Sequence, residues 1–341
     1  MGVSAQQAHE VAIAYEERTK RMGEHGKRMM VFSGTSNPDL SAGVAAHLGV
    51  ELGDVKIRKF ANGEIYVRYL ESVRGADVFL VQSICAPVND MLMELLIMVD
   101  AAKRASARTI TAVISHYGYA RQDKKSAARE PITAKLVADL LTVAGVSRVI
   151  TMDLHQGQIQ GFFNQPVNHL TALPILADYF ESLHLNNVCV VSPDVGRAKA
   201  CKKLADMLGA SLAIMHKGRP DHNVAEITHV IGEVEGKNCI IADDMIDTAG
   251  SVVAGAKALK NAGAAAVYVT ATHGILSAPA FDRLEASVVT EVIVTNTIPV
   301  PDKYLHGKIH VLSVAPLFAH AVQNVFNDES VSELFDPDFQ L

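Results

Sequence analysis

Short apolar runs alternate with helical patterns along most of the chain, and this alternation constrains the fold more than any other feature. The runs are rich in Val and Ile, and most end in polar or acidic residues: MMVFSG (29–34), VFLVQS (78–83), TITAVISHYG (109–118), RVITMDLH (148–155), NVCVVSPD (187–194), CIIADD (239–244) and VYVTATH (267–273). Such runs are expected of parallel strands that are buried on both faces, with functional loops at their carboxyl ends. We therefore predict an α/β fold with right-handed crossovers.

One helix between these runs can be outlined in more detail. Residues 89–103 are helical by pattern, and Asn89 is expected to act as the N-cap. The apolar residues of this segment share one stripe: Met91, Leu95, Met98 and Ala102.

Length and composition exclude several classes of protein. The 341 residues suffice for two domains, and the composition, 49% hydrophobic and 20% charged, is typical of a soluble, core-forming chain. A formal net charge of −6 provides no global basic field for nucleic acid. No apolar stretch approaches the roughly 18 residues of a membrane span, and no secretory signal is visible. We therefore expect a cytoplasmic protein that binds neither nucleic acid nor membranes.

The cysteines agree with that location. They are scattered, without CxxC spacing or a cluster of His and Cys: Cys85, Cys189, Cys201 and Cys239. Four cysteines could pair in an oxidising compartment, but here they are interpreted as small buried residues on strands and helices. A zinc site is not supported.

A weak internal similarity bears on domain organisation. Residues 102–118 resemble residues 259–274, and His116 aligns with His273. Either every αβ unit looks like this, or a domain was duplicated. Duplication would suit the length of the chain and would place a boundary near residue 173.

The most specific local signal is CIIADDMIDTAGSVVAGAKAL (239–259). An apolar strand runs into Asp243 and Asp244, and a turn at 247–251 then opens a helix. The free N–H groups of a helix N-terminus suit a phosphate, and the two carboxylates could accept from vicinal sugar hydroxyls. The alternative is an ordinary βα turn with an acidic N-cap. The stretch resembles the phosphoribosyl-diphosphate-binding motif of type I phosphoribosyltransferases, with Ser251 where Thr is usual and Ala249 where Gly or Cys often stands.

Two further segments suggest a nucleotide site. YGYARQDKK (117–125) is a cationic loop directly after a strand, as several phosphate charges require, although a solvated surface turn is the simpler alternative. KFANGEIYV (59–67) offers Phe60 for stacking on a base, with Asn62 and Glu64 to read its edges. An NGE hairpin turn explains that segment equally well.

Two strand ends offer candidate metal ligands. His155 follows one strand, where a lone histidine is usually structural, and Asp194 of SPDVG follows another. Together they could share a Mg²⁺ ion that is held mainly by phosphates.

Taken together, these segments are strongly similar to ribose-phosphate pyrophosphokinases, in particular to the phosphate-activated bacterial type. The similarity runs from about Met29 to Phe335 and includes FANGE, ESVRG, YGYARQDKK, REPITAKLVADLL, MDLHQGQIQGFF, SPDVG, DDMIDTAGS and ESVSELF. It implies two tandem type I phosphoribosyltransferase-like domains, each a mainly parallel sheet flanked by helices. The expected organisation is an extension at 1–27, an ATP-side domain at 28–172 completed by 312–335, and a ribose 5-phosphate-side domain at 173–311.

The resemblance also implies an activity. Such an enzyme is a transferase that moves the β,γ-diphosphoryl group of ATP to the anomeric hydroxyl of ribose 5-phosphate. The products are AMP and phosphoribosyl diphosphate, which feeds nucleotide, histidine and tryptophan biosynthesis. Mg²⁺ is the expected cofactor, a homohexamer the expected assembly, and phosphate and ADP the expected allosteric effectors. A non-catalytic regulatory paralogue and a phosphoribosyltransferase remain as alternatives; FANGE and ARQDKK argue against the second.

Residue roles carry over by position. ATP would be bound by Phe60, Asn62, Gly63, Glu64, Arg121, Gln122 and Lys124. Ribose 5-phosphate would be bound by Arg219, Asp243, Asp244, Asp247, Thr248, Ala249, Gly250 and Ser251. Lys217 and Arg219, in the HKGRPDHN segment (216–223), would be catalytic, and His155 and Asp194 would contact magnesium. An allosteric anion would lie among Ser72, Arg74, Arg129, Ser330 and Ser332.

Some positions depart from the pattern of this family. Arg197 replaces the second glycine that is usual after the PDxG turn, so the charge near Asp194 is expected to differ. Ala127 stands where a basic residue is common, and Asp221 and His222 occupy positions in the loop after Lys217 that are usually basic.

Overall fold

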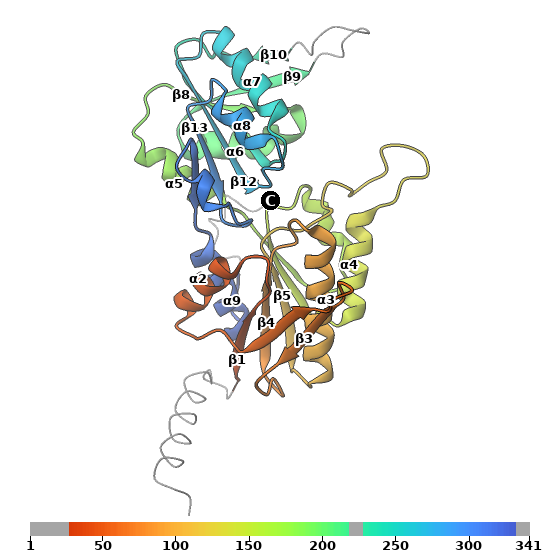
Figure 1. Cartoon of the computed structure of the whole chain (residues 1–341). Coiled ribbons are helices and arrows are strands. Elements are labelled where there is room, and N and C mark those ends of the chain that lie inside the picture. Colours follow the sequence, from red (N-terminus) through yellow and green to blue (C-terminus); the bar gives the residue numbers. More distant parts are fainter. Residues whose placement is uncertain (1–26, 218–227, 332–341) are drawn as a thin grey trace, which may run out of the picture. The chain divides into compact units, whose positions relative to one another are not determined.

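The apolar runs form strands of two separate, mainly parallel sheets. The computed structural model describes residues 27–217 and 228–331, and the chain divides into two units. The first unit is discontinuous: it contains the chain up to Leu170 and the segment from Ala315 onwards. The second unit comprises Thr171–Val314. The boundaries expected from the sequence lay at 172/173 and 311/312. The second of these would cut the strand Ile309–Leu312, which pairs within the sheet of the second unit. Each unit is described by itself below (Figure 1).

The first unit is built on a five-stranded parallel sheet in the order β1-β4-β5-β6-β7. Its strands are β1 Met29–Ser33, β4 Asp77–Gln82, β5 Thr109–Ile114, β6 Arg148–Met152 and β7 Val167–Leu170. A separate antiparallel hairpin consists of β2 Val55–Lys59 and β3 Ile65–Tyr69. The short helix η1, Gly157–Phe162, lies between β6 and β7.

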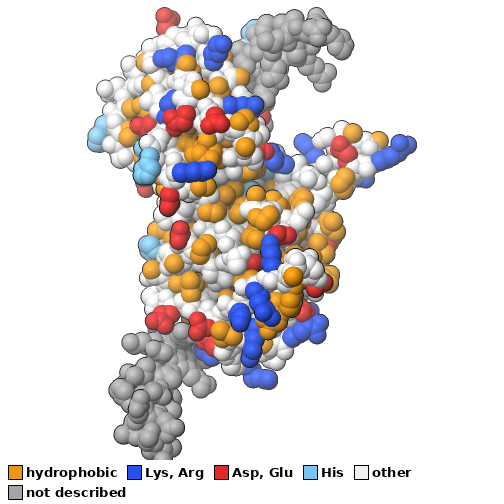
Figure 2. All heavy atoms as spheres, in the orientation of Figure 1, with side chains coloured by type: hydrophobic (Ala, Val, Ile, Leu, Met, Phe, Trp, Pro, Cys, Tyr) orange, Lys and Arg blue, Asp and Glu red, His pale blue; other side chains and the backbone are white. Residues whose placement is uncertain are grey.

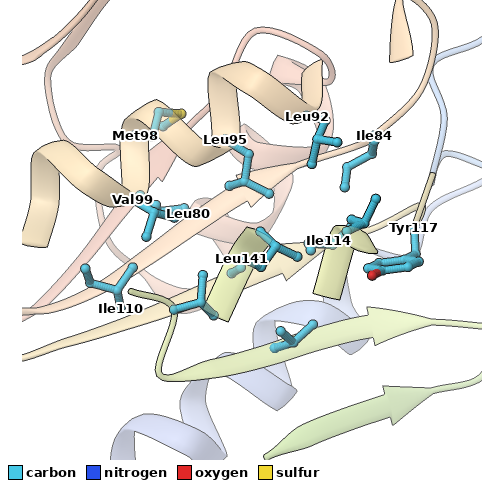
Figure 3. Close-up of a cluster of buried hydrophobic side chains, with 14 of the residues drawn as sticks. Leu80, Ile84, Leu92, Leu95, Met98, Val99, Ile110, Ile114, Tyr117 and Leu141 are labelled. Atoms are coloured by element: carbon cyan, nitrogen blue, oxygen red, sulfur yellow. The ribbon is translucent and has the colours of Figure 1, made fainter. Parts of the chain in front are cut away.

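Helices α3 (Val88–Arg104) and α4 (Thr133–Ala144) pack on one face of this sheet. Figure 3 shows their apolar side chains meeting those of the strands, among them Leu95 with Leu80 and Leu141 with Ile114. The predicted stripe on α3 is buried, which confirms it. The predicted cap is wrong, because the helix begins at Val88 after Pro87. Asn89 instead accepts a hydrogen bond from the Tyr119 hydroxyl.

The alternate strand positions of the same sheet are buried as well. Val31, Phe79 and Val113 are at most 1% exposed, so this face also requires a cover. Helix α9 (Ala315–Asn327) provides it together with α2 (Pro38–Leu48), against which it packs. A Cβ at Gly43 in α2 would lie 2.9 Å from the Cβ of Ala315, so the two helices cross closely. The C-terminal segment therefore completes the core of the first unit.

The second unit contains a seven-stranded sheet in the order β10-β9-β8-β11-β12-β13-β14, parallel except for the edge strand β10. Its strands are β8 Val188–Ser192, β9 Ser211–Lys217, β10 Thr228–Ile231, β11 Asn238–Ile246, β12 Ala266–Gly274, β13 Glu291–Thr295 and β14 Ile309–Leu312. Its helices are α5 Leu173–Ser182, η2 Val195–Arg197, α6 Ala198–Met207, α7 Gly250–Asn261, α8 Ala280–Glu285 and η3 Asp302–Tyr304. Both units thus confirm the predicted α/β class.

The strand order of the second sheet reverses between β8 and β11. From β8 the chain moves to β9 and β10 on one side, and from β11 it moves to β12, β13 and β14 on the other. Crossovers that leave neighbouring strands in opposite directions open a crevice beyond the carboxyl ends of those strands, where ligands bind in open α/β sheets. The predicted sugar site follows β11, at this point of the fold.

The four cysteines are free thiols and all are buried. Cys189 on β8 and Cys239 on β11 are register partners, Cys201 lies on α6, and Cys85 lies in the loop after β4 rather than on a strand or helix. Within residues 27–217 and 228–331, no helix combines the length and the hydropathy that crossing a bilayer requires. The predicted extension up to residue 26, Arg219, the departures at Asp221 and His222, and Ser332 lie outside the described residues.

Candidate active site

Two adjacent carboxylates lie where β11 extends beyond its neighbour. β11 pairs with β8 only from Asn238 to Ile241, whereas its pairing with β12 continues to Ile246. Asp243 and Asp244 therefore follow the last residue of β11 that pairs with β8. The side chain of Asp243 is 25% exposed and that of Asp244 only 3%. Asp243 is therefore the carboxylate of the pair that presents part of its side chain to a ligand.

The turn after β8 brings a cation to this pair. Asp194 begins the turn, and its Oδ1 accepts a hydrogen bond from the backbone N–H of Arg197 at 3.0 Å. The Nε of Arg197 lies 3.5 Å from Oδ1 of Asp243 and 3.9 Å from Oδ1 of Asp244. This Nε is buried and has no hydrogen-bond partner in the part of the chain that the structure describes.

The environment of Asp243 shifts its protonation equilibrium. Burial raises the pKa of Asp243 to about 7, and the neighbouring Asp244 adds to the increase, because the protonated carboxyl is easier to hold beside a second carboxylate. The Arg197 guanidinium and the backbone N–H of Asp244, which donates to Asp243 at 2.8 Å, act in the opposite direction.

The segment after β11 forms the start of α7. Residues 247–249 make the turn, and Gly250 begins the helix after the N-cap residue Ala249, whose methyl side chain cannot accept a capping hydrogen bond. Ala249 adopts φ +59°, a left-handed conformation that costs a non-glycine residue about 1–2 kcal/mol. Thr248 and Ser251 are exposed. The N-terminal amides of a 12-residue helix, flanked by two hydroxyls, are suited to an anion.

Sequence reasoning missed a second cation near this turn. Arg283, from helix α8, donates from Nη1 to the carbonyl oxygen of Thr248 at 3.0 Å. The same Nη1 would lie 3.5 Å from a Cβ added at Gly250. Since 35 residues separate Arg283 from Thr248, no local pattern could indicate this contact.

The predicted catalytic lysine stands at the end of β9, the strand next to the edge strand β10. Lys217 is the last residue of β9, and its backbone pairs with Thr228 at the start of antiparallel β10. The chain between these residues, which carries Arg219, lies outside the described part. The catalytic roles of Lys217 and Arg219 therefore remain predictions.

In the first unit, the turn of the β2–β3 hairpin carries the residues predicted to bind adenine. Phe60 is 45% exposed, and its N–H donates to the Glu64 carbonyl at 2.8 Å. The Asn62 Oδ1 accepts from the Glu64 N–H at 3.2 Å, and Gly63 has φ +93°. The turn thus needs Asn62 and Gly63 for its own geometry, while the Phe60 ring presents a surface for stacking.

An arginine on the same face of the hairpin also escaped the sequence analysis. The guanidinium carbon of Arg58 lies 5.2 Å from the ring centre of Phe60 and 4.9 Å from that of Tyr66. The spacing of Arg58 and Phe60, two residues apart where β2 runs into the turn, was the available signal. Four exposed cations belong to the two strands, and Figure 2 shows blue side chains gathered over this hairpin: Lys56, Arg58, Lys59 and Arg68.

The predicted cationic loop lies between β5 and α4. Arg121, Gln122 and Lys124 are exposed, and Figure 2 shows Lys and Arg side chains at the tip of this protruding segment. The Gln122 Oε1 accepts from the Thr133 hydroxyl at 2.5 Å, and its carbonyl accepts from the Ala134 N–H at 3.1 Å. The base of the loop is therefore fastened to the start of α4.

The remaining predicted residues belong to the candidate magnesium and anion sites. His155 is half-buried in the first unit, whereas Asp194 is exposed in the second, so their shared metal remains a prediction. Among the described residues, no three His, Cys, Asp or Glu side chains form a group that could hold a metal ion. The described members of the proposed anion site are exposed and also remain predictions: Ser72, Arg74, Arg129 and Ser330.

Comparisons with known proteins identify the family. Residues 29–145 match the model of the N-terminal domain of ribose phosphate pyrophosphokinase, and residues 219–336 match the phosphoribosyl synthetase-associated domain. A ribose-phosphate pyrophosphokinase of Caldanaerobacter subterraneus subsp. tengcongensis is 55% identical over 315 residues, which cover 92% of this chain and all of the relative. The chain belongs to the ribose-phosphate pyrophosphokinase family.

Other ribose-phosphate pyrophosphokinases are similar over nearly their whole length. The one from Streptomyces avermitilis is 54% identical over 93% of this chain and 98% of its own. The crystal structure of phosphoribosylpyrophosphate synthetase from Mycobacterium smegmatis superposes with a TM-score of 0.85 at 48% identity, covering 89% of this chain and all of that one. The family predicted from the motifs is thus confirmed, and neither a phosphoribosyltransferase nor a non-catalytic paralogue is favoured.

Proposed function

We propose that this ribose-phosphate pyrophosphokinase family member transfers the β,γ-diphosphoryl group of ATP to the anomeric hydroxyl of ribose 5-phosphate. The products are phosphoribosyl diphosphate and AMP, and the pathway role is the supply of nucleotide, histidine and tryptophan biosynthesis. The observation that carries the proposal is the position of Asp243 and Asp244. They lie at the β8/β11 switch, and two residues separate Asp244 from the turn that opens α7, in a chain that is 55% identical to a named relative.

The second unit supplies the groups for ribose 5-phosphate. The backbone amides of residues 247–251 hold the 5-phosphate, and the hydroxyls of Thr248 and Ser251 add donors. Asp243 and Asp244 accept from the sugar hydroxyls. Arg283 supports the turn from behind through its bond to the Thr248 carbonyl. The anomeric hydroxyl is then held for in-line attack on the β-phosphorus of ATP.

The first unit supplies the groups for ATP. The exposed Phe60 ring stacks on adenine. The edges of the adenine are contacted by Asn62, Gly63 and Glu64. Arg121, Gln122 and Lys124 of the loop before α4 neutralise phosphate charge. Because phosphoryl transfer needs little covalent help from the protein, positioning and charge neutralisation are the main tasks. Lys217 and Arg219 act on the charge that develops on the transferring group.

The donor set fits a magnesium ion that is held mainly by phosphate oxygens. Asp194 is an exposed carboxylate at a strand end, and His155 adds a borderline ligand, so the protein offers too few ligands for a cage of its own. Bound Mg²⁺ would neutralise phosphate charge. Further parts of the proposal are a homohexamer, activation by phosphate, inhibition by ADP, and a cytoplasmic location, which four free buried thiols support.

One assay tests the activity. Purified protein is incubated with ATP and Mg²⁺, with or without ribose 5-phosphate, and AMP and phosphoribosyl diphosphate are quantified by ³¹P NMR. AMP is expected only with ribose 5-phosphate, in equal amount to phosphoribosyl diphosphate, and ribose without its phosphate serves as the control. AMP formation that is independent of the sugar, or a chain that only consumes phosphoribosyl diphosphate in the presence of a nucleobase, would refute the proposal.

A further inference from the structure

The ring of Phe60 needs more than the hairpin turn to hold it in one orientation. The turn fixes the backbone of this residue, whose N–H donates to the Glu64 carbonyl at 2.8 Å and whose carbonyl accepts from the Gly63 N–H at 2.9 Å. These bonds leave the side chain free to rotate between its staggered rotamers. Since 45% of Phe60 is exposed, packing against the core offers little to select one of them. The orientation of the ring therefore depends on its neighbours on the hairpin.

Arg58 and Tyr66 are these neighbours. They are register partners on β2 and β3, so their side chains leave the hairpin on the same face. The guanidinium carbon of Arg58 lies over both rings, 5.2 Å from the centre of Phe60 and 4.9 Å from that of Tyr66. The rings of Phe60 and Tyr66 meet edge to face, with their centres 5.9 Å apart. Each of the three side chains thus contacts the other two.

The charge of Arg58 is directed to the rings rather than to an acid. Arg58 forms no ion pair within the described part of the chain, whereas the next residue, Lys59, pairs with Asp90 of α3. Both ring centres lie inside the roughly 6 Å at which a cation is attracted to an aromatic face. A guanidinium over one face of the Phe60 ring restricts its rotation and leaves the exposed part of the ring to a flat ligand.

We propose that Arg58 is a positioning residue of the nucleotide site: together with Tyr66, it holds the Phe60 ring in the orientation in which adenine stacks on it. The inference rests on the proposed function, which assigns adenine to Phe60. A ring that is already ordered loses less rotational freedom when the base binds, so the affinity for ATP is higher. Adenine lies at the opposite end of ATP from the transferred group. Loss of Arg58 should therefore weaken ATP binding and leave the transfer step unchanged.

Arg58→Met tests the inference, because methionine keeps an unbranched side chain and removes the charge. The full-length protein is assayed with each substrate varied in turn. We expect KM for ATP to rise about three- to fivefold, with kcat and KM for ribose 5-phosphate within about twofold of the wild type. Arg58→Lys, which keeps a cation that can lie over the ring, should recover part of the loss. Tyr66→Ala should raise KM for ATP as well, because it removes the edge contact with Phe60.

A double-mutant cycle separates this role from a direct contact between Arg58 and the phosphates of ATP. If Arg58 acts through the ring, Arg58→Met should cause no further rise in KM for ATP once Phe60 has been replaced by alanine. The matched control is Arg68→Met. Arg68 is an exposed arginine on the same face of the hairpin, but its register partner is Lys56 rather than a ring, so every parameter should stay unchanged.

Circular dichroism establishes that each variant is folded, and Arg58→Gln takes the place of Arg58→Met if the latter does not fold. The inference is overturned by an unchanged KM for ATP in the folded variant, by an equal rise in the Phe60→Ala background, or by an equal effect of Arg68→Met. If the wild type forms no AMP, the proposed function itself is wrong and the inference falls with it.

Discussion

The raised pKa of Asp243 predicts how stability depends on pH. The pKa is about 7 in the folded chain, against 3.8 for an ordinary aspartate, so the folded state holds a proton that the unfolded state has already released. The stabilisation from this protonated carboxyl is fully present below about pH 4 and is lost as the pH rises towards 7. Asp243→Asn, which is neutral at every pH, should therefore gain stability over the wild type as the pH rises.

The magnitude follows from the two pKa values. Each pH unit between them corresponds to about 1.4 kcal/mol, so the full difference is about 4 kcal/mol as an upper bound. The Asp243 side chain is a quarter exposed, and Asp244 shares the proton, so we expect about 2 kcal/mol between pH 5 and pH 8. A domain of this size gains about 3 °C in melting temperature per kcal/mol, which makes the difference about 6 °C.

The assay is thermal unfolding at pH 5, 6, 7 and 8. The chain contains no Trp, so circular dichroism or calorimetry is preferable to intrinsic fluorescence. Asp206→Asn is the control, because it makes the same substitution at an exposed side chain of α6, in an i,i+4 pair with Lys202. The reasoning is refuted if the difference in melting temperature between Asp243→Asn and the wild type is the same at every pH, or if the variant is less stable than the wild type at pH 8. Either result would show that Arg197 keeps Asp243 ionised throughout.

Four further predictions concern other parts of the molecule. Lys217→Ala should lower kcat at least about 100-fold with KM little changed, since the lysine acts on the transition state; a variant that retains more than about a tenth of the turnover excludes this role. Phe60→Ala should raise KM for ATP by about 5- to 100-fold, because stacking worth roughly 1–3 kcal/mol is lost, and an unchanged KM would place adenine elsewhere. Arg129→Ala should abolish activation in a phosphate titration; no activation of the wild type, or an identical curve for the variant, removes the anion site. Gly43→Leu should destabilise the first unit by about 1–3 kcal/mol in urea unfolding, because its side chain would collide with Ala315 of α9, and full stability would contradict the close crossing of α2 and α9.

Most strands and the ends that carry function follow from the sequence. Runs such as VFLVQS and CIIADD are short, apolar at consecutive positions and rich in Val and Ile, which favours strands buried on both faces, and they form β4 and part of β11. The order of residues in DDMIDTAGS likewise places two carboxylates late in a strand and a turn before a helix, because each feature depends on neighbours within a few residues. The family resemblance rests on the same local stretches.

Contacts between distant segments were decided by the tertiary structure alone. Strand order determines that β8 lies beside β11, and only this neighbourhood brings Arg197 to Asp243, 46 positions later in the chain. Arg283 reaches the Thr248 carbonyl in the turn before α7, and α9 covers the first sheet, for the same reason. Even a local prediction can fail for this reason: Asn89 does not cap α3, because its side chain accepts a hydrogen bond from Tyr119, 30 residues away. Periodicity reports which faces of an element are buried, whereas the choice of neighbour depends on the packing of the whole unit.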